Sequence, residues 1–356
     1  MLFSPMTLGE LELPNRLVMA PLTRVRSGQE GIPGPLVVEH YRQRASLGLI
    51  VSEGTYPSHA GRGFPGQPGL VTEEQLKGWA NVTSAVHAEG GRIFAQVMHA
   101  GRVTHEDTTG GHQVVAPSAI AVDGETRTYE GKKSFPVPHA LTTDQLPAIV
   151  QEFVTASRNA IAAGFDGVEL HSANGYLLHE FLAPSANQRG DIYGGSPENR
   201  ARFVIEVAQA VVDAVGADRV GIRISPEHNV QGTTERDASD VRETYAHLVD
   251  ALAPLKLAYL SVLHKEPTSA LVQDLRARFG GTLLLNTGFG VVTTREEAKA
   301  LVADGYADAV VVGRPAIANP DLVRRWREGL PVNEPDPSTF YTEGAQGYTD
   351  YPAYQN

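Results

Sequence analysis

The segment His171-Ser-Ala-Asn-Gly-Tyr176 carries three side chains that could act together on one polarised bond. An imidazole and a carboxamide that lie close together can donate two hydrogen bonds, which polarise one carbonyl or nitro oxygen. The phenol of Tyr176, two residues beyond Asn174, can deliver a proton. No carboxylate or second imidazole is paired with His171, so no metal site is expected. Taken without context, the plainer interpretation is stronger: a histidine satisfied by its neighbours and an ordinary loop tyrosine.

Glycines and an arginine near the C-terminal end of the chain indicate a phosphate site. Gly288-Phe289-Gly290 and Gly313-Arg314 each follow a short apolar run. Backbone N–H groups, a helix N-terminus and a guanidinium can together bind one phosphate group. The alternative is that these glycines only permit tight turns and that Arg314 forms a structural ion pair. We favour phosphate binding, because barrels of parallel strands place such a site at their last two loops.

Three further residues could hold a flat, polar ring. The Gln96 side chain can donate to and accept from a pyrimidine edge, and Arg223 supplies a positive charge that deprotonation does not remove. Gly54 permits a planar ring to approach the backbone closely. A cofactor with a phosphate at one end and a pyrimidine ring at the other would fit these groups. Equally open is that Gln96 and Arg223 satisfy one another or a buried carboxylate.

Short runs rich in Val, Ile and Leu must position these residues, because each candidate follows or ends such a run. The runs alternate with segments of helical period, which is typical of parallel strands and their covering helices. The expected strands are 16–20, 49–53, 92–97, 167–171, 220–225, 257–262, 282–286 and 309–312. The expected helices are 36–45, 73–88, 144–163, 197–215, 237–252, 269–279, 293–303 and 320–328.

Eight strand–helix pairs predict an α/β fold, a (β/α)8 TIM barrel with an N-terminal hairpin and a long excursion, 99–140, after the third strand. No domain break interrupts the pattern, so residues 1–356 are expected to form a single domain. A doubly wound sheet is the alternative. Active sites of such barrels lie at the C-terminal ends of the strands, where the candidate residues fall. Two loops, 99–140 and 226–236 with His228 and Gln231, are expected to shape the substrate site.

Composition excludes several classes of protein. Of the 356 residues, 42% are hydrophobic, and the formal net charge is −11 with scattered basic residues, so neither nucleic acid nor an anionic membrane is an expected partner. The chain has no cysteine, which excludes thiol nucleophiles, disulfides and iron–sulfur clusters. The first residues lack a signal-peptide pattern and no apolar stretch reaches about 20 residues, so a cytoplasmic protein is expected. Gly61–Gly66 matches GxGxxG, but Gln-Pro-Gly follows it and no helix can begin there.

Five segments in combination resemble the Old Yellow Enzyme family of FMN-dependent ene reductases. They are NRLVMAPLTR at 15–24, HSANGY at 171–176, YGGSPENRARF at 193–203, GRP at 313–315 and GYTDYP at 347–352. The resemblance extends from the first residues to the tail and implies a single FMN-binding barrel domain over 1–356. It implies non-covalent FMN, NADPH or NADH as hydride donor, and a small electrophilic alkene as substrate. A homo-oligomer is left open.

The resemblance also implies a role for each site residue. Tyr176, His171 and Asn174 would be catalytic: His171 and Asn174 would bind the activating oxygen of the substrate, and Tyr176 would protonate the substrate. Met98 and Tyr348 would complete the substrate pocket. Thr23 would hydrogen-bond the flavin C4 carbonyl. The full set of implied FMN-binding residues is Pro21, Leu22, Thr23, Gly54, Gln96, Arg223, Gly288, Phe289, Gly313 and Arg314.

The implied reaction is a ping-pong reduction of the C=C bond of α,β-unsaturated carbonyl compounds or nitroalkenes by hydride transfer through flavin N5. The absence of cysteine excludes family members with a 4Fe–4S cluster, and Thr23 excludes those with a cysteine over the flavin. Met98 stands where yeast-like members carry Trp, so an altered pocket width is expected. Asn174 stands where bacterial nitrate-ester reductases often carry His. The competing hypotheses are another flavin-dependent barrel enzyme, a flavin-free sugar-phosphate aldolase or isomerase barrel, and a non-enzymatic binding barrel.

Overall fold

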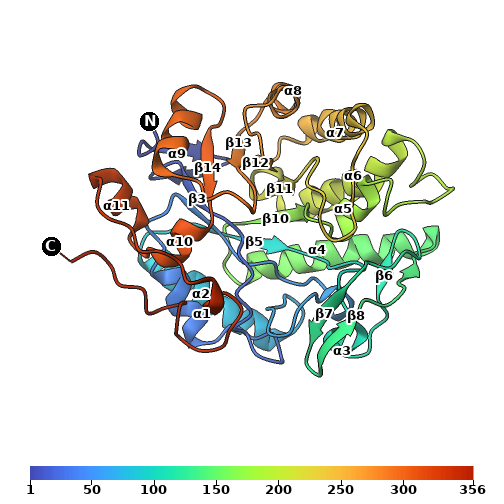
Figure 1. Ribbon diagram of the computed structural model, residues 1–356, viewed down its shortest axis with the longest axis horizontal. Coiled ribbons are helices and arrows are strands. Elements are labelled where there is room, and N and C mark those ends of the chain that lie inside the picture. The colour runs from blue at the N-terminus through green and yellow to red at the C-terminus, as the bar shows by residue number, and fades with distance from the viewer. Residues whose placement is uncertain (356) are drawn as a thin grey trace.

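Runs of β-branched residues and leucine form eight parallel strands that close into a barrel, as predicted (Figure 1). The computed structural model describes residues 1–355. The order around the barrel follows the chain: β3, β4, β5, β10, β11, β12, β13, β14 and back to β3. Their bounds are Leu17–Met19, Leu49–Val51, Ile93–Val97, Gly167–Ser172, Val220–Ile224, Tyr259–Leu263, Leu283–Asn286 and Ala309–Val312. The doubly wound alternative is therefore wrong.

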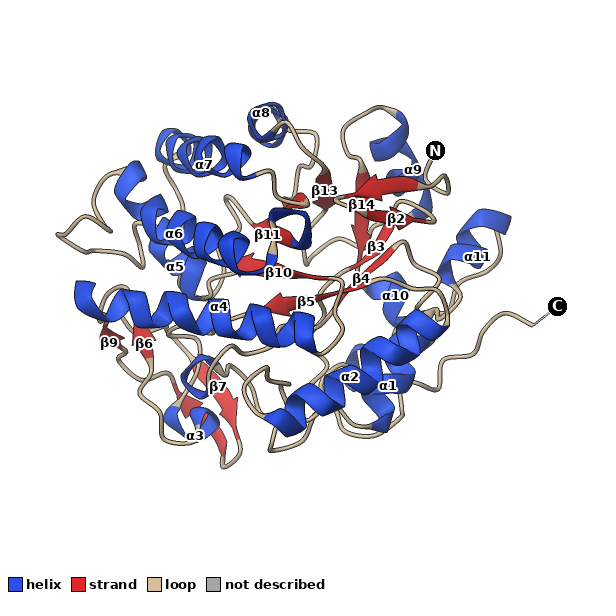
Figure 2. Ribbon diagram, turned by 180° about the vertical axis from the view of Figure 1, so that it is seen from behind, coloured by secondary structure: helices blue, strands red, loops and turns tan. Residues whose placement is uncertain are grey.

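Helices surround the barrel and pack on their sequence neighbours, α4 on α6 and α6 on α7 (Figure 2). The principal helices are α1 (Pro35–Arg42), α2 (Glu73–Ala88), α4 (Leu146–Ala162), α6 (Pro197–Val215), α7 (Ala238–Leu252), α8 (Ala270–Phe279), α9 (Arg295–Ala303) and α11 (Leu322–Glu328). Short helices α3 (Glu106–Thr109), α5 (Leu177–Leu182) and α10 (Arg314–Ala318) lie in the loops that follow strands.

Several helices begin where their capping residues dictate. Thr72 and Gln75 form a capping box at the start of α2, in which the side chain of each residue accepts a hydrogen bond from the backbone N–H of the other. Asp237 accepts from the N–H groups of Ser239 and Asp240, and α7 therefore begins after it rather than at 237. Thr294 caps α9 in the same way, which moves the start from the expected 293 to Arg295.

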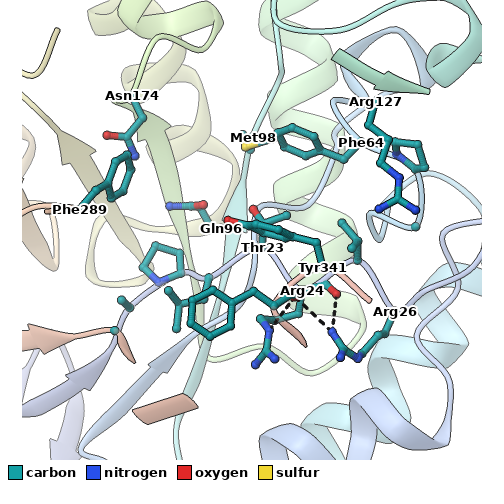
Figure 3. A pocket seen from close by; sticks show the side chains of 18 of the residues that line it. Thr23, Arg24, Arg26, Phe64, Gln96, Met98, Arg127, Asn174, Phe289 and Tyr341 are labelled. Atoms are coloured by element: carbon teal, nitrogen blue, oxygen red, sulfur yellow. Dashed lines mark hydrogen bonds between the residues drawn. The ribbon is translucent and has the colours of Figure 1, made fainter. Parts of the chain in front are cut away.

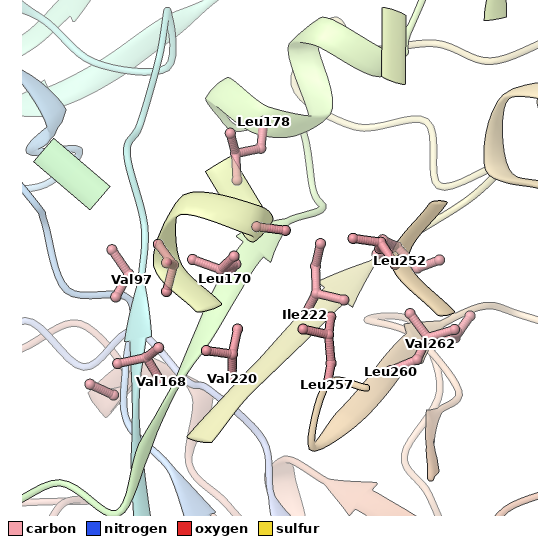
Figure 4. Close-up of a cluster of buried hydrophobic side chains, with 14 of the residues drawn as sticks. Val97, Val168, Leu170, Leu178, Val220, Ile222, Leu252, Leu257, Leu260 and Val262 are labelled. Atoms are coloured by element: carbon pink, nitrogen blue, oxygen red, sulfur yellow. The ribbon is translucent and has the colours of Figure 1, made fainter. Parts of the chain in front are cut away.

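Both faces of the strands are buried, which explains their continuous apolar runs. Val168, Leu170, Val220, Ile222 and Leu260 face the helices in one large cluster (Figure 4). Alternate positions point inward, where a second cluster fills the barrel. Its members are Leu8, Leu13, Val18, Ala20, Leu49, Val51, Phe94, Ala258, Tyr259, Leu284, Ala309 and Val311.

The predicted N-terminal hairpin closes one end of the barrel. Strands β1 (Met6–Leu8) and β2 (Leu11–Leu13) pair antiparallel. Leu8 and Leu13 are buried in the inner cluster together with Ala258, the residue before β12, and Ala309, the first residue of β14. The hairpin therefore covers the N-terminal ends of the strands and leaves the opposite end for the site.

The excursion after β5 has a structure of its own. It contains α3, an antiparallel pair of β7 (Glu125–Thr128) with β8 (Gly131–Ser134), and a parallel pair of β6 (Val115–Ala116) with β9 (His139–Ala140). The tail beyond α11 is held by arginines that follow β3: Arg24 donates to the Gly347 carbonyl at 2.6 Å and Arg26 to the Thr339 carbonyl at 2.9 Å. Within residues 1–355, none of the helices is long and apolar enough to cross a membrane.

Candidate active site

A cavity of about 1290 Å³ opens at the C-terminal ends of the strands, where the sequence placed the site. Figure 3 shows Thr23 and Gln96 at its centre, with Asn174 and Phe289 on one side and Phe64 and Arg127 on the other. The predicted residues that line it are Pro21, Leu22, Thr23, Gln96, Met98, His171, Asn174, Tyr176, Arg223, Gly288, Phe289, Gly313 and Arg314. The barrel thus brings together side chains that lie up to three hundred positions apart in the chain.

Gly54 lies near the site but not on the cavity wall. A Cβ atom added there would lie 2.6 Å from Met98 Sδ and 3.4 Å from Gln96 Oε1. The close approach that requires a glycine is therefore made by the Met98 side chain. The approach of a planar ring to the Gly54 backbone stays a prediction.

Tyr348 is not a wall of the cavity either. It is fully buried, and its ring stacks on His40 with centroids 4.0 Å apart and planes 9° from parallel. The Arg26 guanidinium carbon lies 4.3 Å from the centroid of the same ring. The tail tyrosine that does line the cavity is Tyr341, which is 58% exposed. The stacking with His40 and the two arginines turns Tyr348 away from the substrate region.

His171, Asn174 and Tyr176 are gathered by the end of β10 and the turn before α5. Asn174 takes a left-handed backbone conformation (φ +60°), supported by its N–H, which donates to Ser225 Oγ at 2.9 Å. The His171 and Tyr176 rings lie 5.2 Å apart. His171 Nδ1 and Asn174 Oδ1 are buried and have no hydrogen-bond partner among the described residues. Such atoms in a folded protein call for a ligand or water.

Burial sets the protonation of these groups. Desolvation lowers the pKa of His171 well below its usual value, and the nearby charge of Arg223 lowers it further. Burial raises the pKa of the Tyr176 phenol to about 12, against a hydrogen bond from Gln231 that lowers it. At neutral pH His171 is therefore uncharged and Tyr176 keeps its proton, as a proton donor must.

Gln96 and Arg223 lie in adjacent layers of the barrel interior. Gln96 Nε2 donates to Glu169 Oε1 at 2.8 Å, so part of the alternative interpretation, a carboxylate partner, is correct. Arg223 donates to Ser261 Oγ at 3.2 Å and to Asn286 Oδ1 at 2.8 Å, while its Nε has no partner among the described residues. Both side chains are thus held by partners within the barrel, and both residues line the cavity.

The two glycine-rich loops meet at Arg314, which donates to the Phe289 carbonyl at 2.8 Å. Within residues 1–355 no carboxylate lies within ion-pair distance of Arg314, so the ion-pair alternative is not borne out. Gly288 has φ +101°, a conformation that favours glycine. The cavity thus offers four kinds of polar group: the Gln96 amide, the Arg223 guanidinium, the Thr23 hydroxyl and the backbone of the two loops. This set suits a flat ring that carries a phosphate tail.

Other residues on the cavity wall were not singled out from the sequence as site residues. Gln231 was placed only within a loop; its Nε2 donates to the Asn174 carbonyl at 2.6 Å, and its own φ is +54°. Phe64, from the segment that matches GxGxxG, packs edge-on against Tyr176 with centroids 6.3 Å apart. Arg127 comes from β7 in the excursion. No local pattern marks these residues, since loop conformation alone brings them to the site.

The comparisons with known proteins agree with this geometry. A sequence profile of the NADH:flavin oxidoreductase / NADH oxidase family matches residues 1–333. The chain is 42% identical to a probable flavin mononucleotide-dependent alkene reductase of Leishmania infantum, over 99% of this chain and 97% of the relative. It is 41% identical to 12-oxophytodienoate reductase 1 of Oryza sativa subsp. japonica, over 99% and 92%.

Solved structures give the same result. An old yellow enzyme homologue from Zymomonas mobilis superposes with a TM-score of 0.94 at 40% identity, covering 99% of both chains. Morphinone reductase in complex with tetrahydroNAD superposes with a TM-score of 0.93 at 44% identity, covering 100% of this chain and 98% of the other. The flavin-free sugar-phosphate alternative finds no support in these relatives. The chain therefore belongs to the NADH:flavin oxidoreductase / NADH oxidase family, and within it to the Old Yellow Enzyme group of FMN-dependent alkene reductases.

Proposed function

We propose that the cavity at the barrel mouth binds FMN on its inner wall and reduces the C=C bond of activated alkenes on the side of His171 and Asn174. The observation that carries this assignment is His171 Nδ1, a buried ring nitrogen with no partner among the described residues, in the same cavity wall as Asn174, whose side-chain NH2 group can donate. Two donor-capable side chains facing one hollow suit a substrate oxygen.

The residues that would hold FMN fall into three groups. Gln96 and Arg223 would bind the pyrimidine edge, with Thr23 at the adjacent carbonyl and Pro21 and Leu22 against the ring. The loop residues would bind the phosphate: Gly288, Phe289, Gly313 and Arg314. When bound, FMN supplies reversible hydride transfer between a nicotinamide donor and the alkene. Because the Arg223 guanidinium keeps its charge, it would favour a ring that gains negative charge.

On the substrate side of the site, side chains would polarise the activating oxygen of the substrate and protonate the substrate. A neutral His171 donates one hydrogen bond and the Asn174 amide a second, and both strengthen as negative charge grows on the substrate oxygen. Tyr176 holds its proton on the phenolic oxygen, because burial raises the pKa of the phenol. Met98, Tyr176 and Val103 form an apolar cluster with Phe64 and Phe135, so water is excluded from one wall.

The natural substrate and the cellular location are two finer parts of the proposal. We place the enzyme in the cytoplasm with a small electrophilic alkene as its natural substrate. Subcellular fractionation would test the location. Sedimentation of the purified protein would test whether it forms a homo-oligomer.

A visible spectrum of the purified protein tests the proposed function. We expect oxidised-flavin bands that bleach on anaerobic addition of NADPH and return on addition of 2-cyclohexenone. A colourless protein that takes up no added FMN would contradict the cofactor site. A flavin that bleaches but is not reoxidised by the enone would contradict the proposed substrate side.

A further inference from the structure

A buried carboxylate lies beneath the cavity and has no role in the function proposed above. Glu169, on β10, is 1% exposed and does not line the cavity. Its register partners are Gln96 on β5 and Gly221 on β11, and Gly221 in turn pairs with Tyr259 on β12. These residues form one layer of the barrel interior. Glu169 therefore stands directly behind a residue assigned to the cofactor.

Both oxygens of Glu169 accept a hydrogen bond. Gln96 Nε2 donates to Oε1 at 2.8 Å, and the Tyr259 hydroxyl donates to Oε2 at 3.0 Å. An amide NH2 group can only donate, so the carboxylate decides which end of the Gln96 carboxamide points inward. The amide oxygen, Oε1, is left as the end available to a ligand. An acceptor at that position suits a ring N–H, as on a pyrimidine edge.

Glu169 also faces a buried positive charge. The next layer toward the cavity holds His171, Arg223 and Ser261, which share one register. The direct hydrogen-bond partners of Arg223 are uncharged. Burial raises the pKa of Glu169, whereas the charge of Arg223 and the hydrogen bonds from Gln96 and Tyr259 lower it and favour the carboxylate form. In the described part of the chain, Glu169 and Arg223 do not form an ion pair within 4.0 Å. Their attraction is therefore a longer-range electrostatic one across the interior of the barrel. In such a medium charges act over several ångströms.

We infer that Glu169 is a positioning residue of the cofactor site, which orients the Gln96 carboxamide and partly offsets the charge of Arg223. The inference rests on the proposed roles of Gln96 and Arg223 toward FMN. It has two separable consequences. The orientation of Gln96 governs how tightly the oxidised cofactor binds, and the offset of Arg223 governs how readily the cofactor accepts electrons.

The conservative variant Glu169→Gln separates these two effects. The new side chain keeps a carbonyl that can accept from Gln96 Nε2, but the negative charge is gone. We expect FMN to bind with little change, while the ratio of reduced to oxidised FMN affinity rises about tenfold. For a two-electron couple that equals a midpoint potential about 30 mV higher. Potentiometric titration of the holoenzyme measures it.

Glu169→Leu removes both the charge and the acceptor. We expect it to show the raised potential and also an FMN dissociation constant at least tenfold above that of Glu169→Gln. Should Glu169→Leu fail to fold, the potential of the isosteric Glu169→Gln decides. Glu180→Gln is the control for replacement of a buried carboxyl, because Glu180 accepts from the Arg102 N–H and is not bonded to Gln96 or Arg223. Burial raises the pKa of Glu180 to about 8, so the variants are compared at about pH 9, where this substitution also removes a negative charge. Its potential should equal that of the wild type.

Two results would overturn the inference: an unchanged potential in Glu169→Gln, or equal FMN affinity in Glu169→Leu and Glu169→Gln. Gln96→Leu distinguishes this failure from failure of the proposed function. If Gln96→Leu weakens FMN binding while both Glu169 variants match the wild type, only the role of Glu169 is wrong. If Gln96→Leu binds FMN normally, the proposed cofactor contact is wrong and the inference falls with it.

Discussion

Individual residues at this site owe their chemical state to burial. His171 and Tyr176 lie in the same hollow, and the same loss of solvent moves their pKa values in opposite directions, down for the imidazole and up for the phenol. Both shifts favour the neutral, protonated donor at physiological pH. The His171 imidazole and the Tyr176 phenol are therefore both uncharged and able to donate a hydrogen bond at this pH.

The proton donor can be tested by Tyr176→Phe. Loss of the phenol removes the proton but leaves the FMN contacts and the His171 and Asn174 donors in place. We expect the reoxidation of reduced enzyme by 2-cyclohexenone to slow by about 10²–10⁴-fold, while reduction by NADPH is unaltered. Stopped-flow measurement of the two half-reactions separates them. Equal slowing of both would show that the substitution disturbs the whole site rather than proton transfer.

Met98→Trp tests the width of the pocket. The Met98 thioether lies against Gly54, where even a Cβ would come within 2.6 Å of Sδ, so an indole cannot take the same space. It must project into the cavity. We expect kcat/KM for bulky substituted enones to fall at least about tenfold, a barrier increase of about 1.4 kcal/mol, and product stereochemistry to change. Met98→Leu is the control; an unchanged substrate range in Met98→Trp would contradict this.

At the scale of elements, the fold attaches two irregular segments to a regular barrel. The tail is tied to the loop after β3 by Arg24 and Arg26, and the excursion is tied to α5, where Glu180 accepts from the Arg102 N–H at 2.9 Å. Both attachments bring a wall residue to the cavity: Tyr341 from the tail and Arg127 from the excursion. The barrel supplies the candidate catalytic residues, while these segments contribute walls of the cavity around them.

The tail attachment predicts different outcomes for two tyrosines. Tyr348 is fully buried, and its hydroxyl has no hydrogen-bond partner among residues 1–355. Tyr348→Ala should lower the free energy of unfolding by about 3–5 kcal/mol, whereas Tyr348→Phe should leave it equal or higher. The exposed Tyr341→Ala should change it by less than about 0.5 kcal/mol and raise the KM for the enone instead. Urea unfolding and steady-state kinetics decide; a raised KM in Tyr348→Phe would restore Tyr348 to the pocket.

The attachment of the excursion predicts a pH dependence of stability. Burial raises the pKa of Glu180 to about 8, from an ordinary value near 4.5. Between these values the folded protein keeps a proton that the unfolded chain releases, so this carboxyl lowers stability as pH rises through the window. Relative to Glu180→Gln, the wild type should lose up to about 1.4 kcal/mol per pH unit from pH 4.5 to 8. A difference that is constant over this range would contradict the shift.

At the scale of the whole molecule, we propose that the chain behaves as one domain. The N-terminal hairpin packs into the inner core, and the tail returns to α1, where Tyr348 stacks on His40. The two tryptophans, Trp79 in α2 and Trp326 in α11, lie in the same hydrophobic cluster. Nothing in these contacts suggests a part that could unfold alone.

Single-tryptophan variants, Trp79→Phe and Trp326→Phe, test this cooperativity. We expect the fluorescence transitions in urea to coincide with each other and with the loss of helical circular dichroism, as for a two-state domain. Release of bound FMN should follow the same curve. Transitions at separate urea concentrations would show that the region around α11 and the tail unfolds independently of α2.

The sequence by itself determined the barrel and the placement of most candidate site residues at the C-terminal ends of its strands. Strand and helix periodicity, capping residues and turn glycines act over a few neighbouring positions, so they can be read without knowing the fold. Because the C-terminal ends of parallel strands lie at the same end of the barrel, a polar residue at the end of a predicted strand is predicted to belong to the site. His171, Arg223 and Gln96 were found in this way, and the cavity unites them.

Only the tertiary structure decided which loop residues complete the site. The partners of Tyr348 lie far away in sequence, and Arg24 reaches Gly347 across 323 positions, so no local pattern distinguishes Tyr348 from Tyr341. The place of Gly54 depends on the Met98 side chain, and that of Gln231 on a left-handed turn. In the sequence, Glu169 looks like an ordinary residue of a strand. Pairing of β10 with β5 in the closed barrel places it behind Gln96. Contacts between residues far apart in the sequence determine which of several local conformations of similar energy is adopted. The pattern of neighbouring residues in the sequence does not contain this information.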